Sequence, residues 1–342
     1  MSVRVEEIKG DRKEEWNNVV SQSPHTTFFH RLEALAILAR HFEASLHPLI
    51  GYVGQEPVGL LPMFGQTKGP FLLATSPPLS VEISAGPALL NFEKLKTRKA
   101  EQRHQAFVDS CFEWIEEEME PDLVEIKTPS RYSDVRPFIR QGCSVSPSYT
   151  YVLDLSRDEQ TLLDQFSTDA RNSIRTTDDA AYDITEGGRD VIEEIGSTVQ
   201  DRFEALGEYH YLDTDLLVDL YETCGSSSVR PYACWVDGNF ASGMIVLEHG
   251  DTVYSWQGGS KPDAELPVNE LLDWQIIRDG KRRGMTRYDM VGAMIPRLCE
   301  YKSKFGPEAE PIYVIKQSSP AAKIAEKTYR RMPTTVREVF DL

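Results

Sequence analysis

The sequence predicts an α/β fold made of two domains, each with a mixed, partly antiparallel sheet. Three observations support this prediction. A chain of 342 residues is long for a single hydrophobic core. The composition is globular, with 40% hydrophobic, 10% aromatic and 27% charged residues. One order of elements (two helices, a strand meander, a helix and a strand) occurs twice along the chain, which is typical of an α/β domain with antiparallel neighbours.

In the first half, the spacing of apolar residues distinguishes helices from strands. Two apolar runs flank the turn-forming sequence GQEP and predict a hairpin. A later stretch with apolar residues at helical spacing predicts a long amphipathic helix before a short buried strand. The predicted elements are strand 3–8, helices 11–23 and 31–42, hairpin 46–64, strand-like sequence 71–90, helix 99–119, strand 122–127, helix 134–142 and strand 148–155.

The second half repeats this order with little sequence identity. Its hairpin turns at the sequence DGN. We place the boundary near residue 153, which gives domains 1–153 and 154–342. The predicted elements are helix 158–180, strand 182–186, helices 190–207 and 214–224, hairpin 229–250, strand 252–260, helix 269–284, strand 286–292, strand 311–317 and a closing helix.

Net charge and cysteine use limit the partners that we expect. There are 54 acidic against 37 basic side chains, a formal net charge of −17, which repels nucleic acids and anionic membranes. Such acidity also suits a high-salt cytoplasm, an ordinary acidic surface being the alternative. Five separate cysteines without a CxxC pair indicate reduced thiols. The amino terminus shows no apolar signal core and no run is long enough to span a membrane, so we expect a cytoplasmic protein without an integral membrane segment.

The strongest local departure from this acidity lies near the carboxyl terminus. Between Arg278 and Lys304 there are eight basic and three acidic residues, punctuated by glycines. The cations at 281–283 suit the end of a helix. Lys302 and Lys304 lie in a predicted loop, where helix capping does not explain them.

Four motifs stand in order over about fifty residues: YSWQGGS at 254–260, an Asn-initiated helix carrying Trp at 267–284, RYDMVGA at 287–293 and EYKSKFG at 300–306. Together they resemble the carboxyl-terminal signature of the FemAB-like proteins, which are tandem GNAT-fold transferases that include BioF2-like acetyltransferase domains. The helix at 169–184 resembles the family's Arg-rich entry to the second domain. The first half resembles the family mainly in its order of elements.

This resemblance implies two tandem GNAT-like domains and transfer of an acyl group to an amine. In that fold two neighbouring strands diverge and expose backbone to the acyl donor, and 252–260 and 286–293 are the pair that fits. Acyl-CoA is the candidate donor, although the pyrophosphate loop of GNAT enzymes (Arg/Gln-x-x-Gly-x-Gly/Ala) is absent before both central helices. A long helical hairpin of the kind found in some transfer-RNA-dependent members is also absent.

Two residues are our candidates for catalysis. We expect Lys302 to neutralise a phosphate or the developing oxyanion, the alternative being a surface lysine. Asp289 ends an apolar strand, where ligands of open sheets gather, and is expected to orient the acceptor amine or accept its proton. The alternative for Asp289 is a carboxylate that caps nearby backbone amides.

Further residues are candidates for binding donor or substrate. The glycines permit close approach of a ligand, or alternatively only form turns. Asn269 is also a candidate helix cap, the tryptophans are alternatively core residues, and the two arginines, four apart on one helix face, alternatively pair with Asp178 or Asp179. The set is Tyr254, Trp256, Gly258, Gly259, Asn269, Gly292, Lys304, Phe305, Arg171 and Arg175.

The motifs of other enzyme classes are missing. The histidines show no HExxH or other metal-ligand spacing, so we expect no metal. The sequence also has no GxSxG and no P-loop, which argues against a hydrolase and a nucleotide triphosphatase. The sequence therefore predicts an N-acyltransferase that moves an acetyl or aminoacyl group to an amine of a sugar, peptide or lipid-linked envelope precursor. Two alternatives stay open: a silent tandem-GNAT protein that only binds a ligand or partner, and a transferase that uses aminoacyl-tRNA. The oligomeric state is left open.

Overall fold

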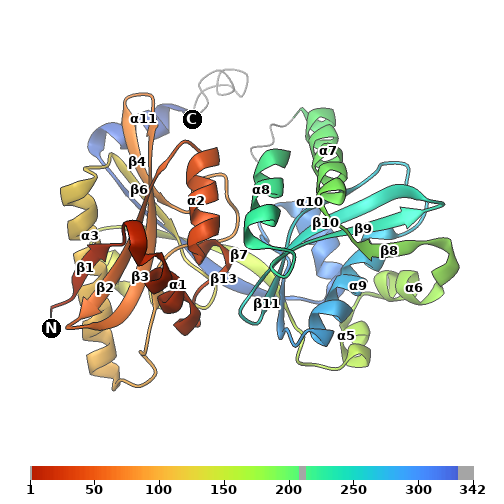
Figure 1. Cartoon of the computed structure of the whole chain (residues 1–342), viewed down its shortest axis with the longest axis horizontal. Coiled ribbons are helices and arrows are strands. Elements are labelled where there is room, and N and C mark those ends of the chain that lie inside the picture. Colours follow the sequence, from red (N-terminus) through yellow and green to blue (C-terminus); the bar gives the residue numbers. More distant parts are fainter. Residues whose placement is uncertain (1, 208–212, 330–342) are drawn as a thin grey trace. The chain divides into compact units, whose positions relative to one another are not determined.

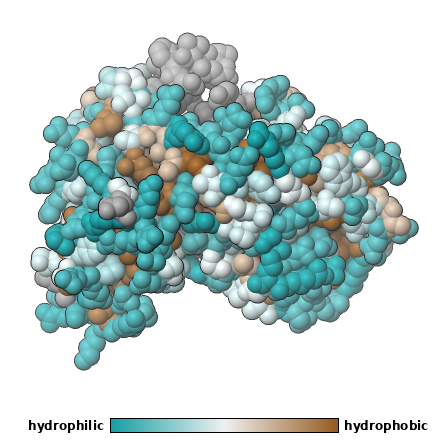
Figure 2. Space-filling view, in the orientation of Figure 1, coloured by the Kyte–Doolittle hydropathy of each residue, from teal (hydrophilic) through white to brown (hydrophobic). Residues whose placement is uncertain are grey.

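The computed structural model describes residues 2–207 and 213–329. These residues form two units, one from 2–147 with 312–329 and the other from the described part of 148–311 (Figure 1). Each unit contains one mixed sheet covered by helices. On the visible face of each unit most side chains are hydrophilic, in keeping with the net charge of −17 (Figure 2).

The sheet of the first unit runs in the order β1-β2-β3-β4-β6-β13, with β5 beside β3. Only β4 and β6 are parallel, and the other neighbours are antiparallel. The strands are β1 (Arg4–Glu7), β2 (Ser45–Val53), β3 (Glu56–Lys68), β4 (Phe71–Ser76), β5 (Ala88–Leu89), β6 (Leu123–Lys127) and β13 (Glu308–Ser318).

Helix α3 packs on this sheet because its apolar residues recur at helical spacing, as at Phe107, Cys111 and Ile115, all buried. Glycine is needed at Gly51 and Gly59, since a Cβ at either would lie within 2.8 Å of the Phe107 ring. The helices are α1 (Lys13–Gln22), α2 (Leu32–His41), α3 (Thr97–Glu118), α4 (Arg136–Arg140) and α11 (Pro320–Tyr329).

The second unit repeats the scheme in the order β7-β12-β11-β10-β9-β8. Again one pair, β11 with β12, is parallel and the others are antiparallel. The strands are β7 (Ser144–Asp154), β8 (Asp183–Glu186), β9 (Val229–Val236), β10 (Asn239–His249), β11 (Thr252–Ser260) and β12 (Arg287–Asp289).

Helix α9 carries the core of the second unit, and α7 contacts the strands β9, β10 and β11 (Figure 1). Polar side chains cap several helix starts: Asp158 for α5, Ser167 for α6 and Asp213 for α8. The helices are α5 (Glu159–Gln165), α6 (Thr168–Thr176), α7 (Arg189–Leu206), α8 (Thr214–Cys224), α9 (Val268–Arg282) and α10 (Pro296–Lys302).

Two sequence predictions differ from this fold. The helix expected at 158–180 is interrupted, because Phe166 has an extended backbone (ψ 149°) and Ser167 begins a new helix. The division into 1–153 and 154–342 also differs from the two units, since the described residues from Ile312 onwards belong with the first unit. There β13 pairs with β6, while the end of β7 pairs with β12.

Candidate active site

The parallel strands β11 and β12 of the second unit part after a short ladder. Three residue pairs join them, the last being Tyr254 with Asp289. Beyond it β11 continues to Ser260, whereas the chain after Asp289 follows β7, with Met290 N donating to Tyr151 O at 2.8 Å. Within the described residues no further pair connects the two strands. Beyond Tyr254, the edge of β11 that faced β12 therefore lacks β12 as a neighbour. These are the two strands that the sequence analysis expected to diverge.

The other edge of β11 is irregular at the same place. Its register with β10 shifts so that Ile245 lies opposite Gln257 but Val246 lies opposite Ser255. Trp256 is the extra residue between them, the arrangement of a β-bulge. Bulges bend a strand, increase its twist and are frequent beside active sites. The bulge thus lies just beyond Tyr254, where β11 leaves β12.

The two glycines of β11 have different surroundings. A Cβ on Gly258 would lie 2.4 Å from the carbonyl oxygen of Gly243, whereas the nearest atom to a Cβ on Gly259 is 3.7 Å away in Val199. Both glycines lie within the strand, so the interpretation of them as turn residues is wrong. Gly258 is required by the close approach of the β10 backbone.

Asp289 is buried at the end of β12 (8% exposed). Its Oδ1 accepts hydrogen bonds from Val291 N at 2.8 Å and from Thr150 Oγ1 at 2.5 Å. Thr150 Oγ1 in turn accepts from Gly292 N at 3.2 Å. Burial raises the pKa of Asp289, and the bonds from Thr150 and Val291 oppose this shift. The carboxyl thus bonds a backbone amide, as the alternative reading of Asp289 expected.

Lys302, the last residue of α10, returns to the same turn. Its Nζ donates to Val291 O at 2.6 Å and to Gly292 O at 3.0 Å. The side chain is half-buried, so the loop lysine of the sequence prediction is a helix-terminal residue directed at backbone carbonyls. Gly292 has a left-handed φ of 80° and is a turn residue.

Lys304 and Phe305, which follow Lys302 in the same motif, make packing contacts within the second unit. Lys304 Nζ forms an ion pair with Glu270 of α9 at 2.9 Å and lies 3.5 Å from Asp169 of α6. Phe305 is fully buried, with its ring edge-to-face against Phe166 at a centroid distance of 5.1 Å. These contacts join three helical segments of the second unit.

Asn269 links α9 to the sheet. Its Oδ1 accepts from Ser242 Oγ of β10 at 2.7 Å, and its Nδ2 donates to Ser260 Oγ of β11 at 3.0 Å. The helix starts at Val268 with Pro267 in the cap position, so the prediction that Asn269 caps it is wrong. The side chain instead fixes the helix start against the end of β11.

The remaining candidates divide between the buried and the exposed. Tyr254 and Trp256 are buried in β11 (7% and 5% exposed). Arg171 donates to Asp164 O at 3.3 Å, and Arg175 lies 3.8 Å from Asp164 Oδ1. Both arginines of α6 thus contact Asp164 at the end of α5, and not the two aspartates that follow them in sequence.

Asp273 of α9 is a buried acid beside the candidate site that the sequence analysis did not single out. It is 3% exposed and accepts hydrogen bonds from Tyr288 at Oδ1 and from Tyr301 at Oδ2, the latter at 2.6 Å. Burial raises its pKa, against the effect of these two donors. The signal in the sequence was an acid four residues after Asn269, within the apolar stripe of a helix.

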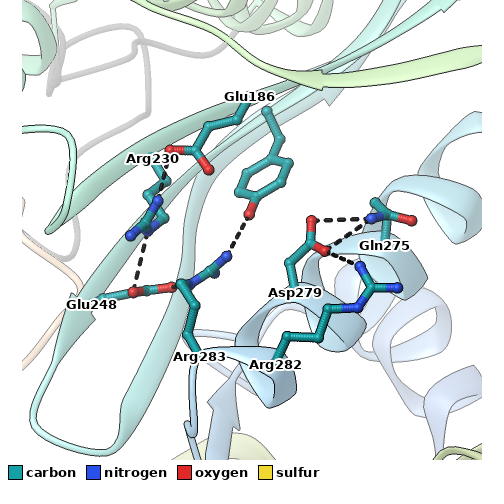
Figure 3. Close-up of polar contacts among 8 residues, drawn as sticks. Glu186, Arg230, Glu248, Gln275, Asp279, Arg282 and Arg283 are labelled. Carbon is teal, nitrogen blue, oxygen red and sulfur yellow. Dashed lines mark hydrogen bonds and ion pairs between the residues drawn. The ribbon is translucent and has the colours of Figure 1, made fainter.

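A second buried acid, Glu248 of β10, lies in the polar network of Figure 3. Arg283 donates from Nε to Glu248 Oε1 at 2.9 Å, and Arg230 Nε lies 3.2 Å from Oε2. Arg283 also donates to Tyr232 Oη at 3.1 Å, and Arg230 pairs with Glu186 at 2.7 Å. This network pins the carboxyl end of α9 to the sheet.

The family of the second unit follows from its sequence. Residues 165–303 match the model of a family described as "Acetyltransferase (GNAT) domain". The chain contains a GNAT acetyltransferase domain. The matched residues lie within the unit that contains the parting strands. No curated protein is similar enough in sequence to be a recognisable relative.

Solved structures extend the likeness to the whole chain. The crystal structure of FemX has a TM-score of 0.72 at 12% identity and covers 90% of this chain and 96% of its own. A tandem GNAT protein from the clavulanic acid biosynthesis pathway has a TM-score of 0.53 at 11% identity, covering 92% and 98%. The carboxyl-terminal domain of a putative lysylphosphatidylglycerol synthetase from Agrobacterium fabrum has a TM-score of 0.59 at 12% identity and covers 93% of this chain and 95% of its own.

These likenesses confirm the predicted tandem GNAT-like α/β fold. The family match supports acyltransferase activity for the domain at 165–303, and the solved structures show the fold of the whole chain. Among the described residues no helix is both long and apolar enough to cross a membrane. The same residues contain no group of three or more His, Cys, Asp or Glu side chains arranged to hold a metal ion.

Proposed function

We propose that the second unit transfers an acetyl or aminoacyl group from a thioester or ester donor to an amine of a sugar, peptide or lipid-linked envelope precursor. The observation that carries this proposal is the parting of β11 from β12 after Tyr254 and Asp289 within a GNAT domain. A strand edge without a neighbour offers backbone donors and acceptors to an extended ligand such as a pantetheine arm. The bulge at Trp256 lies on that strand.

The chemistry needs no covalent enzyme intermediate. The acceptor nitrogen attacks the acyl carbonyl carbon, a C–N bond forms, and the C–S or C–O bond to the carrier breaks. The proton lost by the amine ends on the departing thiolate or alkoxide. The protein contributes by holding the two reactants in line and by excluding water, which together account for much of the rate of such transfers.

The start of α9 bears on which carrier, CoA or an aminoacyl ester, delivers the acyl group. Its first turn contains Glu270, which pairs with Lys304, and the sequence there lacks the pyrophosphate loop of GNAT enzymes. An acid at a helix amino terminus competes with phosphate for the same partial positive charge. These two features argue against a CoA pyrophosphate at this helix start. The GNAT acetyltransferase model that matches residues 165–303 favours acyl-CoA, so we propose acyl-CoA as the general donor class, with an aminoacyl ester as the second. The FemX likeness supports the latter.

A direct experiment separates the donors. The purified protein is incubated with acetyl-CoA, or with charged transfer RNA, and with amino sugars, peptides and aminolipids, and acylated amines are detected by mass spectrometry. Product from acetyl-CoA supports the first donor class. Product that disappears after ribonuclease treatment supports the aminoacyl-tRNA alternative. Donor binding without product in any combination contradicts the proposed transfer and supports a silent binding protein.

A further inference from the structure

The turn that follows β12 has an unusual backbone. Val291 and Gly292 have φ angles of 50° and 80°, both in the left-handed region. A glycine adopts this region freely, but a β-branched residue such as valine is a true outlier there. Such strain persists only where the surrounding structure enforces it, and it is concentrated at functional sites. Val291 is also buried, at 7% exposure.

Three side chains enforce the turn. Its two amides donate to Asp289 Oδ1 (from Val291 N, 2.8 Å) and to Thr150 Oγ1 (from Gly292 N, 3.2 Å). Its two carbonyls accept from the single ammonium of Lys302, at 2.6 and 3.0 Å. All four backbone polar groups of the turn are thus bonded. Asp289 and Thr150 are further joined to each other by a hydrogen bond of 2.5 Å.

The turn leads from the end of the β11–β12 ladder into a short apolar segment. After it Ala293 N donates to Tyr149 O at 2.8 Å, and then Met294 and Ile295 are 58% and 48% exposed, beside Tyr149 at 39%. These three are half of the large exposed apolar side chains among the described residues. We name residues 293–295 the rim segment.

The rim segment belongs to a loop closed upon itself. It leads into α10, whose last residue, Lys302, returns to the turn where the loop began. Tyr301 anchors the same end through its hydrogen bond to Asp273. Compact loops with their ends held together are frequently functional. Releasing Lys302 would free both the turn and the rim segment.

We propose that Lys302 and Asp289 are positioning residues, which act through the Val291–Gly292 turn and hold the rim segment against the acyl acceptor. This assignment rests on the proposed acyl transfer. It replaces the direct contact with the reacting atoms that the sequence suggests for both residues. The apolar side chains of the rim segment favour an acceptor with an apolar portion next to its amine.

The test combines hydrogen exchange with kinetics. Lys302→Met removes the ammonium at nearly constant length, and Lys302→Arg retains a cationic donor. The matched control is Lys281→Met, because Lys281 also donates to two backbone carbonyls, those of Leu155 and Arg157, but at the carboxyl end of α9. Amide exchange of residues 291–302 is measured by mass spectrometry. Turnover is measured with acetyl-CoA and octylamine, with ethylamine as the acceptor lacking a long chain.

We expect Lys302→Met to speed exchange in 291–302 at least tenfold and to raise the KM for octylamine about tenfold, with kcat within about threefold of wild type. Lys302→Arg should restore both, Met294→Ser should raise the same KM, and Lys281→Met should leave both unchanged. Val291→Gly should at least halve the fall in Tm caused by Lys302→Met, because glycine tolerates the turn unaided.

Unchanged exchange in Lys302→Met would overturn the proposal, as would a loss of kcat with an unaltered KM, which would place Lys302 at the reacting atoms. If the wild-type protein acylates neither amine, the proposed transfer to simple amines is wrong. Hydrogen exchange still tests whether Lys302 holds the Val291–Gly292 turn. Faster exchange then supports the hold on the turn, and unchanged exchange refutes it.

Discussion

Tyr288 of β12 and Tyr301 of α10 donate hydrogen bonds to opposite oxygens of one buried carboxylate, Asp273 of α9. Tyr288 precedes Asp289 and Tyr301 precedes Lys302, so the two residues that hold the strained turn are each next to a tyrosine fixed by Asp273. A strand, a long helix and a short helix are thereby joined on one side of β12. We expect this second network to help hold the turn in place.

The acid Asp273 should make stability depend on pH. Burial raises its pKa above that in the unfolded chain. The protonated carboxyl therefore contributes its full stabilisation below the unfolded pKa, and this stabilisation is lost as the pH rises through the pKa of the folded state. Asp273→Asn, which is always neutral, should therefore gain stability relative to wild type between pH 4.5 and pH 7. Urea unfolding at both pH values measures the difference, with the exposed Asp263→Asn as control. An equal difference at the two pH values would contradict this account.

His104 of the first unit should act in the opposite direction. It is 4% exposed, and burial lowers its pKa to about 4 despite the nearby Asp134 carboxylate. Stability is therefore full above the unfolded pKa of about 6.5 and is lost as the pH falls towards 4, by at most about 3 kcal/mol. Asp134 remains ionised across this range, because its hydrogen bond with Arg136 lowers its pKa to about 2.

His104→Gln should flatten that acid dependence. The histidine ring bonds Tyr132 Oη, and the amide of glutamine has both a donor and an acceptor for that hydroxyl while it does not titrate. Urea unfolding from pH 7 to pH 4.5 compares the two slopes. If the slope of the variant equals that of wild type, the acid sensitivity resides in other groups.

The sequence predicts those features of the fold that depend on contacts within one segment, and it misses those that depend on residues far away in the chain. Helix and strand periodicity identified the repeated order of elements, because the pattern is read within each segment. The break at Phe166 was missed although Ser167 gives a local cap signal, because the packing of the Phe166 ring against Trp274 and Phe305 is remote in sequence. Strand neighbours are equally remote, and nothing within 311–317 shows that β13 pairs with β6.

The site was predicted in part for the same reason. Motifs located the diverging strands and the turn at Gly292. Partners of charged side chains are set by tertiary packing, so the two acceptor carbonyls of Lys302 and the contact of Arg175 with Asp164 could not be read from spacing. Asp273 resembles any polar residue of an amphipathic helix until its two tyrosine partners are seen.

The adjacent glycines of β11 provide a matched pair. Gly258→Ala would place a Cβ 2.4 Å from the backbone oxygen of Gly243, which cannot move without disturbing β10, so we expect a loss of about 1–3 kcal/mol. In Gly259→Ala the nearest atom is 3.7 Å away, an ordinary contact, and stability should change little. Chemical unfolding of both variants checks the difference. Equal losses would show that the sheet, and not this close approach, resists a side chain.

The buried Glu248 should be costly to remove. Its side chain is 4% exposed and lies between Arg230 and Arg283 (Figure 3). The side chains of these two arginines are only 16% and 24% exposed. Glu248→Ala leaves two partly buried cations without this partner. Breaking a fully buried pair costs about 3–5 kcal/mol, so we expect a loss towards the lower end of that range. Glu222→Ala is the control, because Glu222 and its partner Arg189 are both more than half exposed. Exposed pairs contribute at most about 1 kcal/mol.

A triple replacement distinguishes pairing from mere burial. If the arginines are costly only because their partner is missing, Glu248→Met together with Arg230→Met and Arg283→Met should recover most of the stability lost in Glu248→Ala, since apolar side chains can replace a buried ionic cluster. Recovery without loss of the α9 position would show that the network serves stability alone. A triple variant as unstable as Glu248→Ala would mean that the hydrogen bond from Arg283 to Tyr232 is needed to seat the end of α9 on β9.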